Sequence, residues 1–265
     1  MTLLDAVGRQ HQPVDPQSTP RIISLVPSIT ETLCDLGLAA SLVGRTGFCI
    51  HPAEIVRGIP KIGGTKDINF DKVRQLAPTH LLVNIDENEK PTVDALAEFI
   101  PQVIVTHPLA PRDNLALFRL LGGIFRAEDK AEALCAAFEQ EYAALHTAPK
   151  GPPQTLLYCI WRDPWMTISP DTYIARMMAE IGWRCWTSPA NDLRYPAFTW
   201  SDELVHSIDG VVLSSEPYRF TEQHVDALKR QIGKPVRLVD GEMMSWYGSR
   251  AITGLRYLRQ LGCAK

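Results

Sequence analysis

The chain has 265 residues, a length that suits one large domain or two small ones with separate apolar cores. Apolar residues make up 45% and charged residues 22% of the sequence, which argues against a disordered or fibrous protein. The formal net charge is −3 and the two signs are interspersed, so neither nucleic acid nor an anionic membrane is an expected partner. A small molecule or another protein is expected instead.

The N-terminal segment, residues 1–20, is polar and proline-rich, and it predicts a disordered or extended structure. It lacks a basic start followed by a continuous apolar run, so it does not read as a signal peptide. No window elsewhere reaches the roughly 20 apolar residues that a membrane span requires. We therefore expect no membrane insertion and a cytoplasmic protein from the sequence as given, or a periplasmic one if a leader precedes it.

The first half of the chain alternates short apolar runs with helical patterns. Ser28 is expected to cap the first helix and Gly37 to end it. Because buried parallel strands read as continuous apolar runs, residues 21–126 are predicted to form an α/β lobe. The predicted strands are 21–26, 42–44, 80–84 and 102–106, and the predicted helices are 30–36, 70–76 and 93–99.

A long helix is predicted to follow this lobe. An apolar stripe at helical spacing, including Leu134, Phe138 and Leu145, runs through residues 127–146. Such a helix is roughly 30 Å long and is expected to join two lobes over residues 127–150. Pro152 and Pro153 end it, because proline lacks the backbone donor that a helix requires.

The second half, residues 151–265, repeats the order of the first. The repeat predicts two Rossmann-like lobes with mostly parallel sheets, joined by one long helix. In open α/β sheets ligands gather outside the carboxyl ends of the strands, so the loops there are expected to face one cleft. The predicted strands are 155–160, 210–214 and 235–239, and the predicted helices are 172–181 and 201–207.

These loops are rich in aromatic and charged residues. Large apolar side chains at loop tips indicate either a stacking surface for a flat ligand or rings that pack the lobes together. The expected apolar walls are Trp161, Trp165, Tyr218, Trp246 and Tyr247. The expected polar contacts are Lys66, Glu87, Arg162, Glu216 and Arg250.

Other chemistry receives little support. No G-x-S-x-G turn and no H-E-x-x-H helix is present, so no catalytic residue is predicted. Gly63 and Gly64 precede Lys66, but the order of a phosphate-binding loop is absent. Cys49 and His51 suit a tight loop better than a metal site, and none is predicted. The six cysteines form no C-x-x-C pair, which favours reduced structural thiols.

The run RIISLVPSITE at 21–31, with Gly44, the loop at Pro52 and the helix start at Asn69–Asp71, resembles the cobalamin-binding and ferric-siderophore-binding proteins of ABC importers. Four short segments resemble a subgroup described as helical-backbone metal receptors: residues 64–66, 84–88, 214–218 and 246–250. The resemblance implies two lobes held by a rigid helix, a ligand in the interlobe cleft, and an ABC permease that docks on acids of both lobes.

Asp71 matches the first docking acid of that family, and in the second lobe the match falls at Ser201, beside Asp202 and Glu203. Thr65 stands where cobalamin binders carry a cleft tryptophan, which argues against cobalamin itself. The expected function is reversible binding of a corrinoid-like or chelated-metal ligand for ABC-type uptake, without a covalent cofactor and without catalysis. Two alternatives stay open: a cytoplasmic enzyme with Glu87 or Glu216 as general base, and a protein-interaction module.

Overall fold

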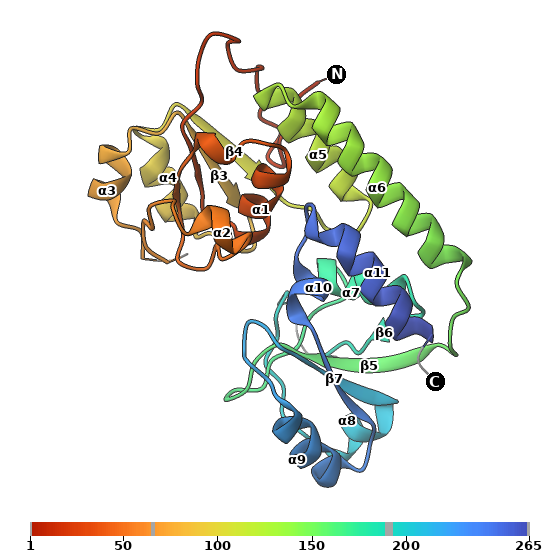
Figure 1. The fold of residues 1–265 in the computed structure, drawn as a ribbon. Coiled ribbons are helices and arrows are strands. Elements are labelled where there is room, and N and C mark those ends of the chain that lie inside the picture. The colour runs from red at the N-terminus through yellow and green to blue at the C-terminus, as the bar shows by residue number, and fades with distance from the viewer. Residues whose placement is uncertain (1, 65–66, 189–192, 264–265) are drawn as a thin grey trace. The chain divides into compact units, whose positions relative to one another are not determined.

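The computed structural model describes residues 2–64, 67–188 and 193–263, and the chain divides into two compact units. Unit 1 contains residues 1–108, 112–137 and 247–250, and unit 2 contains residues 109–111, 138–246 and 251–265. Each unit is built on its own parallel sheet with helices against it (Figure 1). The predicted fold class, two α/β lobes with parallel sheets, is therefore confirmed.

Unit 1 carries a four-stranded sheet in the order β2-β1-β3-β4. β1 and β3 are buried along their whole length, as expected for apolar runs in the middle of a covered sheet. β3 and β4 pair in register from His80 opposite Gln102 to Asn84 opposite Thr106. The strands are β1 (Ile22–Ser24), β2 (Leu42–Arg45), β3 (His80–Asn84) and β4 (Gln102–Thr106).

The helices of unit 1 include one that the sequence reading missed, α5. Its run is apolar almost all round, so it shows no amphipathic stripe. Gly122 permits close helix packing, because an added Cβ would lie 2.5 Å from the Ala131 side chain of α6. The helices are α1 (Pro27–Asp35), the 3₁₀ turn η1 (Ala39–Ser41), α2 (Ala53–Val56), α3 (Phe70–Gln75), α4 (Lys90–Ala97) and α5 (Asp113–Phe125).

The prediction that Ser28 caps the first helix is wrong. Val26 is the N-cap residue and Pro27 occupies the first turn, so Ser28 lies inside α1 and is buried. Proline suits the first helical position because its missing N–H has no partner there in any case. The predicted end is confirmed: α1 ends at Asp35, and Gly37 takes a φ of +80°.

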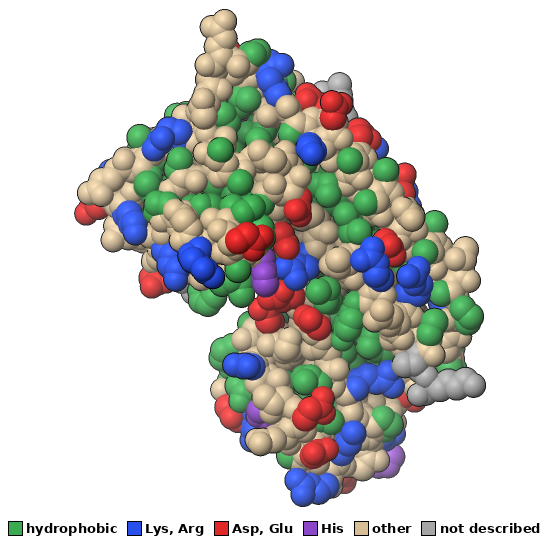
Figure 2. Space-filling model, viewed as in Figure 1, with side chains coloured by type: hydrophobic (Ala, Val, Ile, Leu, Met, Phe, Trp, Pro, Cys, Tyr) green, Lys and Arg blue, Asp and Glu red, His purple; other side chains and the backbone are tan. Residues whose placement is uncertain are grey.

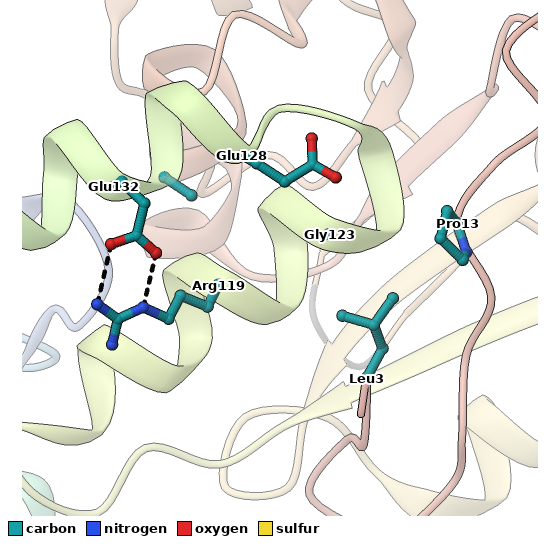
Figure 3. Close-up of a pocket in the computed structure, with 7 residues that line it drawn as sticks. Leu3, Pro13, Arg119, Gly123, Glu128 and Glu132 are labelled. Carbon is teal, nitrogen blue, oxygen red and sulfur yellow. Dashed lines mark hydrogen bonds and ion pairs between the residues drawn. The ribbon is translucent and has the colours of Figure 1, made fainter. Parts of the chain in front are cut away.

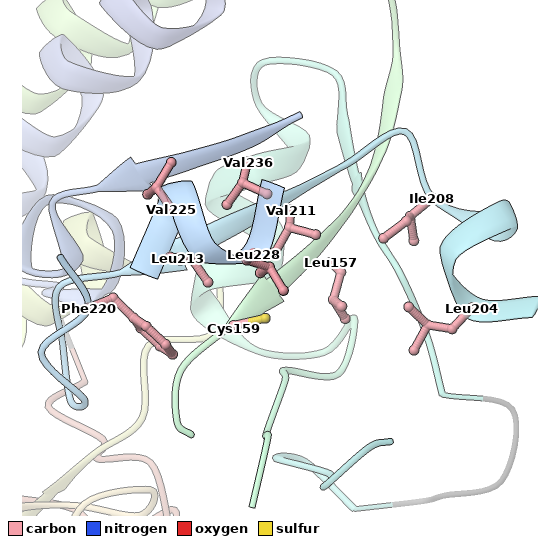
Figure 4. Close-up of a cluster of buried hydrophobic side chains, with 10 residues drawn as sticks. All are labelled: Leu157, Cys159, Leu204, Ile208, Val211, Leu213, Phe220, Val225, Leu228 and Val236. Atoms are coloured by element: carbon pink, nitrogen blue, oxygen red, sulfur yellow. The ribbon is translucent and has the colours of Figure 1, made fainter. Parts of the chain in front are cut away.

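Unit 2 repeats the topology of unit 1, with the strand order β6-β5-β7-β8. Leu157 of β5 and Leu213 of β7 lie in an apolar core with residues of α8 and α9 (Figure 4). The strands are β5 (Gln154–Cys159), β6 (Trp183–Cys185), β7 (Gly210–Ser214) and β8 (Val236–Val239). The helices that begin in unit 2 are α7 (Tyr173–Ala179), α8 (Asp202–Ser207), α9 (Glu222–Ile232) and α10 (Gly241–Ser245).

Two helices run from one unit into the other. α6 (Glu128–Thr147) leaves unit 1 between Ala137 and Phe138, and α11 (Arg250–Cys263) begins with one residue in unit 1. The division therefore differs from the predicted limits at 126 and 150, and it places residues 247–250 in unit 1. Periodicity marks where a helix begins and ends, whereas packing decides which unit each turn joins.

The N-terminal segment, residues 2–20, contains no helix or regular strand but has defined contacts in unit 1. The buried Asp5 carboxylate accepts the backbone N–H groups of Arg9 at 2.8 Å and Val105 at 3.2 Å, and it lies 3.2 Å from His11 Nε2. Leu3 packs against Gly123 of α5, beside a cavity of about 220 Å³ that also borders the Arg119–Glu132 pair (Figure 3). The segment thus covers the free edge of β4.

His80, the first residue of β3, gives unit 1 a pH dependence. Burial, with a smaller effect of His11, lowers its pKa from an ordinary 6.5 to about 4. The unfolded chain then takes up the proton first as the pH falls, so this contribution to stability is complete above pH 6.5 and is lost between pH 6.5 and 4. The loss is up to about 3 kcal/mol.

We therefore expect His80→Gln to show a smaller loss of unfolding free energy between pH 6.5 and 4 than the wild type shows. Urea unfolding at a series of pH values, followed by circular dichroism, measures this difference. Parallel pH dependences in the two proteins would contradict the assignment.

Candidate functional site

The exposed indole of Trp161 is the central feature of the candidate site. β5 ends at Cys159, and Trp161 and Met166 pair across the short hairpin that follows. The Trp161 ring is 40% exposed and meets the Tyr218 ring edge-on, with centroids 5.6 Å apart. The Tyr218 amide donates to Ile160 O at 3.2 Å, which ties the loop after β7 to the loop after β5. Two of the predicted ligand-binding rings therefore lie together at the carboxyl ends of adjacent strands.

Trp165 and Arg162 lie in the same hairpin but differ in exposure. Trp165 stacks on the buried Phe220 with ring centroids 5.7 Å apart, and it meets Trp200 edge-on at 5.5 Å. This ring therefore serves in part to pack the core of unit 2. The Arg162 guanidinium lies 5.9 Å from the Trp165 ring centre, and its side chain is 44% exposed. A cation thus stands beside the aromatic surface.

The remaining predicted residues of unit 2, Glu216 and Trp246, bind each other. The Trp246 indole Nε1 donates to Glu216 Oε2 at 3.1 Å. Trp246 is 8% exposed, so its ring offers little surface to a ligand. The predicted role of Trp246 as an apolar wall does not match this burial.

Tyr247 and Arg250 belong to unit 1, where they contact acids. The Tyr247 hydroxyl donates to Glu87 Oε1 at 2.6 Å, and burial together with Glu87 raises the pKa of Tyr247 well above its ordinary value. Arg250 makes a bidentate ion pair with Glu31, in which Nε donates to Oε2 at 2.8 Å and Nη2 donates to Oε1 at 2.7 Å. Tyr247 is 6% exposed. These side chains hold the 247–250 segment in unit 1 and present little of themselves to a ligand.

The sequence reading missed an exposed apolar group in unit 1. Phe48, Ile50 and Ile85 are 61%, 47% and 46% exposed, in the loops that follow β2 and β3. Their position after strands was the available signal, but single apolar residues in loops do not stand out as aromatic clusters do. Unit 1 thus also presents apolar side chains from loops at the carboxyl ends of its strands.

The predicted docking acids occupy equivalent helices of the two units. Asn69 caps α3 and Ser201 caps α8, each by accepting a backbone N–H with its side chain. With these caps aligned, Asp71 and Glu203 both stand at the second helical position, and both are exposed. The structural equivalent of Asp71 is therefore Glu203, whereas the sequence reading matched Ser201. Lys66 and Thr65 lie outside the described residues.

Metal chemistry finds no support in the part of the chain that the structure describes. No group of three His, Cys, Asp or Glu side chains that could hold a metal ion occurs there. Cys49 is buried between the hydroxyls of Thr30 and Thr46, at 3.1 and 3.2 Å, and burial raises the pKa of its thiol. Cys49 is thus a protonated packing residue. All six cysteines lie in described regions, and no disulfide bond joins any two of them.

Within the described ranges, no helix combines the length and the apolar character that crossing a bilayer requires. On the face shown in Figure 2, basic side chains are scattered among acidic ones rather than gathered in a stripe.

Comparison with known proteins decides the family. Residues 22–200 match the family of periplasmic binding proteins. The chain belongs to this family. This periplasmic binding protein is 24% identical over 259 residues to the uncharacterized ABC transporter substrate-binding lipoprotein YvrC of Bacillus subtilis, covering 91% of this chain and 79% of that protein. The predicted resemblance to the binding proteins of ABC importers is confirmed.

Two vitamin B12-binding proteins of Pectobacterium are also similar. That of Pectobacterium carotovorum is 24% identical over 131 residues, covering 49% of this chain and 47% of the relative. That of Pectobacterium atrosepticum is 24% identical over 139 residues, covering 49% of this chain and 50% of the relative. The matches to these two relatives therefore span about half their length.

Solved structures share the fold of this periplasmic binding protein. The heme-binding protein RhuT from Roseiflexus sp. RS-1, in its apo form, matches with a TM-score of 0.75 and 21% identity, covering 92% of this chain and 97% of that chain. The vitamin B12-binding protein BtuF of Vibrio cholerae matches with a TM-score of 0.74 and 14% identity, covering 92% and 98%. At these identities the likeness establishes the fold alone.

Proposed function

We propose that this periplasmic binding protein reversibly binds a corrinoid-like or chelated-metal ligand and delivers it to an ABC importer. The observation that carries the proposal is the Trp161 ring, which stands exposed beside Tyr218 where β5 and β7 end. An exposed indole offers a large apolar face to a flat ligand, and a guanidinium in the same hairpin, 5.9 Å from the Trp165 ring centre, suits anionic groups on that ligand. Arg162 supplies the cation.

The names of similar proteins support this ligand class. Vitamin B12 and heme, which appear in those names, are both flat macrocycles with a metal at the centre. A planar ring system can lie against Trp161 and Tyr218 while its polar substituents reach Arg162. The exposed Phe48, Ile50 and Ile85 offer a second apolar surface, in unit 1.

Binding without turnover fits the acids better than catalysis does. Glu87 and Glu216, the two candidate general bases, each accept a hydrogen bond from a buried aromatic residue. An oxygen that already accepts a hydrogen bond within the protein is less available to take a proton from a ligand. We propose that a bound ligand is released intact, which mass spectrometry of the recovered ligand tests directly.

Delivery requires a surface that a permease can recognise. We propose Asp71 and Glu203, with the neighbouring Asp202, as docking acids, because all three are exposed at helix starts and Asp71 and Glu203 take equivalent positions in the two units. Charge reversal at Asp71 and Glu203 should abolish uptake while ligand affinity stays unchanged. Detection of the native protein in a periplasmic extract tests the compartment in which such delivery takes place.

Trp161→Ala is expected to weaken ligand affinity by at least about tenfold, because the stacking surface is lost. Titration with cobalamin, cobinamide, hemin and ferric chelates, followed by tryptophan quenching and by ligand absorbance, measures the effect. Absorbance is needed because the variant itself lacks one fluorophore.

Trp161→Phe is the matched control, because it keeps a flat apolar ring and should retain most of the affinity. Equal affinity of the alanine variant and the wild type would remove Trp161 from the site. If none of these compounds binds, the proposed ligand class is wrong for this protein, although its family membership still holds.

A further inference from the structure

Trp246 and Tyr247 make equivalent hydrogen bonds in different units, although they are neighbours in sequence. Trp246 belongs to unit 2 and donates its indole N–H to Glu216 of the same unit, at 3.1 Å. Tyr247 belongs to unit 1 and donates its hydroxyl to Glu87 of that unit, at 2.6 Å. One peptide bond therefore separates two aromatic donors that hold acids of different units.

The two acids occupy equivalent places in the duplicated fold. Glu87 lies in the loop after β3, and Glu216 lies in the loop after β7. β3 and β7 are the third strands in the matching orders β2-β1-β3-β4 and β6-β5-β7-β8. We name residues 85–88 the first acid loop and residues 215–218 the second acid loop. Each acid loop is thus held by one of two consecutive residues.

The backbone around these two residues is firmly held. The Gly248 amide donates to the buried Asn114 side chain at 2.5 Å, and the Ser249 amide donates to the buried Thr32 hydroxyl at 3.0 Å. On the other side, the Trp246 amide donates to Glu242 O at 3.0 Å at the end of α10. Displacing either aromatic residue would break buried hydrogen bonds, which are costly to leave unmade.

We infer that Trp246 and Tyr247 form a latch that positions both acid loops and passes a disturbance of one loop to the other. Both residues are positioning residues, because their rings are buried and their polar atoms are directed at the acids. The inference rests on the proposed function in one respect, that the acid loops lie at the carboxyl ends of strands where the ligand is expected to bind. The coupling between the loops requires no ligand.

Hydrogen exchange of the ligand-free protein tests the latch. Tyr247→Phe removes one hydroxyl and keeps the ring. Losing one hydrogen bond of ordinary net strength should speed exchange about fivefold in the loop it holds. The reporters are the Asp86 and Asn88 amides in the first loop, bonded to Asn84 at 2.8 and 3.0 Å, and the Tyr218 amide in the second.

The decisive result is the effect in the other unit. Tyr247→Phe should also speed exchange at Tyr218, and Trp246→Phe should speed exchange at Asp86 and Asn88. Tyr142→Phe is the matched control, because it removes a different Tyr–Glu hydrogen bond, that to Glu180 at 3.2 Å, and should change neither loop. Exchange that increases only in the loop next to each altered residue would overturn the latch.

Ligand dissociation provides an independent second measurement. If one of the chelates binds, Tyr247→Phe should speed its release, whereas Tyr142→Phe should not. A protein that binds none of them would refute the proposed function, and the exchange result would still decide the latch. Faster exchange in both loops with unchanged ligand release would uphold the coupling and show that the ligand does not use these loops.

Discussion

Gly248→Ala is expected to destabilise unit 1 by about 3 kcal/mol, from backbone strain and steric overlap together. Gly248 has a φ of +75°, a conformation that side chains disfavour. A Cβ at this position would overlap Thr32 Oγ1 and lie 3.3 Å from Ser28 O, both within α1. Urea unfolding followed by circular dichroism measures the loss.

Gly37→Ala separates the two causes. Gly37 also lies in unit 1 and has nearly the same φ, +80°, but no atom beyond its own residue and its two chain neighbours lies within 4 Å of the position of its Cβ. It should therefore lose only the strain contribution, about 1 kcal/mol. Equal losses at the two glycines would show that the close approach of the 247–250 segment to α1 has no energetic weight.

Arg250→Ala is expected to cost about 3 kcal/mol of unfolding free energy, because it leaves the Glu31 carboxylate largely buried and without its ion pair. The two side chains are 12% and 16% exposed, and the guanidinium reaches the carboxylate at 2.8 and 2.7 Å. Water can replace little of this interaction. Urea unfolding measures the loss, and raised salt should change it little, since buried pairs are poorly screened.

Arg119→Ala is the matched control for Arg250→Ala. Arg119 and Glu132 have the same two-pronged geometry, at 2.7 and 2.9 Å, but their side chains are 34% and 57% exposed. Solvent screening makes such surface pairs weak, so the loss should be much smaller. A loss as large as that of Arg250→Ala would mean that geometry, rather than burial, determines the strength of both pairs.

Local sequence patterns predicted the strands well. The bounds predicted for β3, β4 and β7 are those observed, because buried parallel strands are short continuous apolar runs between polar turns. α5 was missed for a related reason, since a helix covered on nearly every side has no polar face to reveal its period. The order of elements along the chain also indicated a repeat, although β6 was not among the predicted strands and its pairing with β5 came from the structure.

Part of the candidate site was equally accessible from the sequence. Trp161 and Tyr218 follow the adjacent strands β5 and β7, so parallel topology alone brings them to one edge of the sheet. The sequence reading had grouped Trp246 and Tyr247 with this pair, but Trp246 and Tyr247 are buried whereas Trp161 is exposed. An aromatic residue in a loop can face solvent or fill a core, and its own sequence does not distinguish the two.

The sequence by itself determined the α/β class, the duplication, the family and the loops that carry the chemistry, because each depends on residues close together in the chain or on the order of elements. Only the tertiary structure decided which of those residues are buried in contacts within the protein and which are exposed. Tyr247 and Glu87 are 160 positions apart, and they form a hydrogen bond in a segment that approaches α1 closely at Gly248. Contacts of this kind arise from packing between distant segments, which no local pattern records.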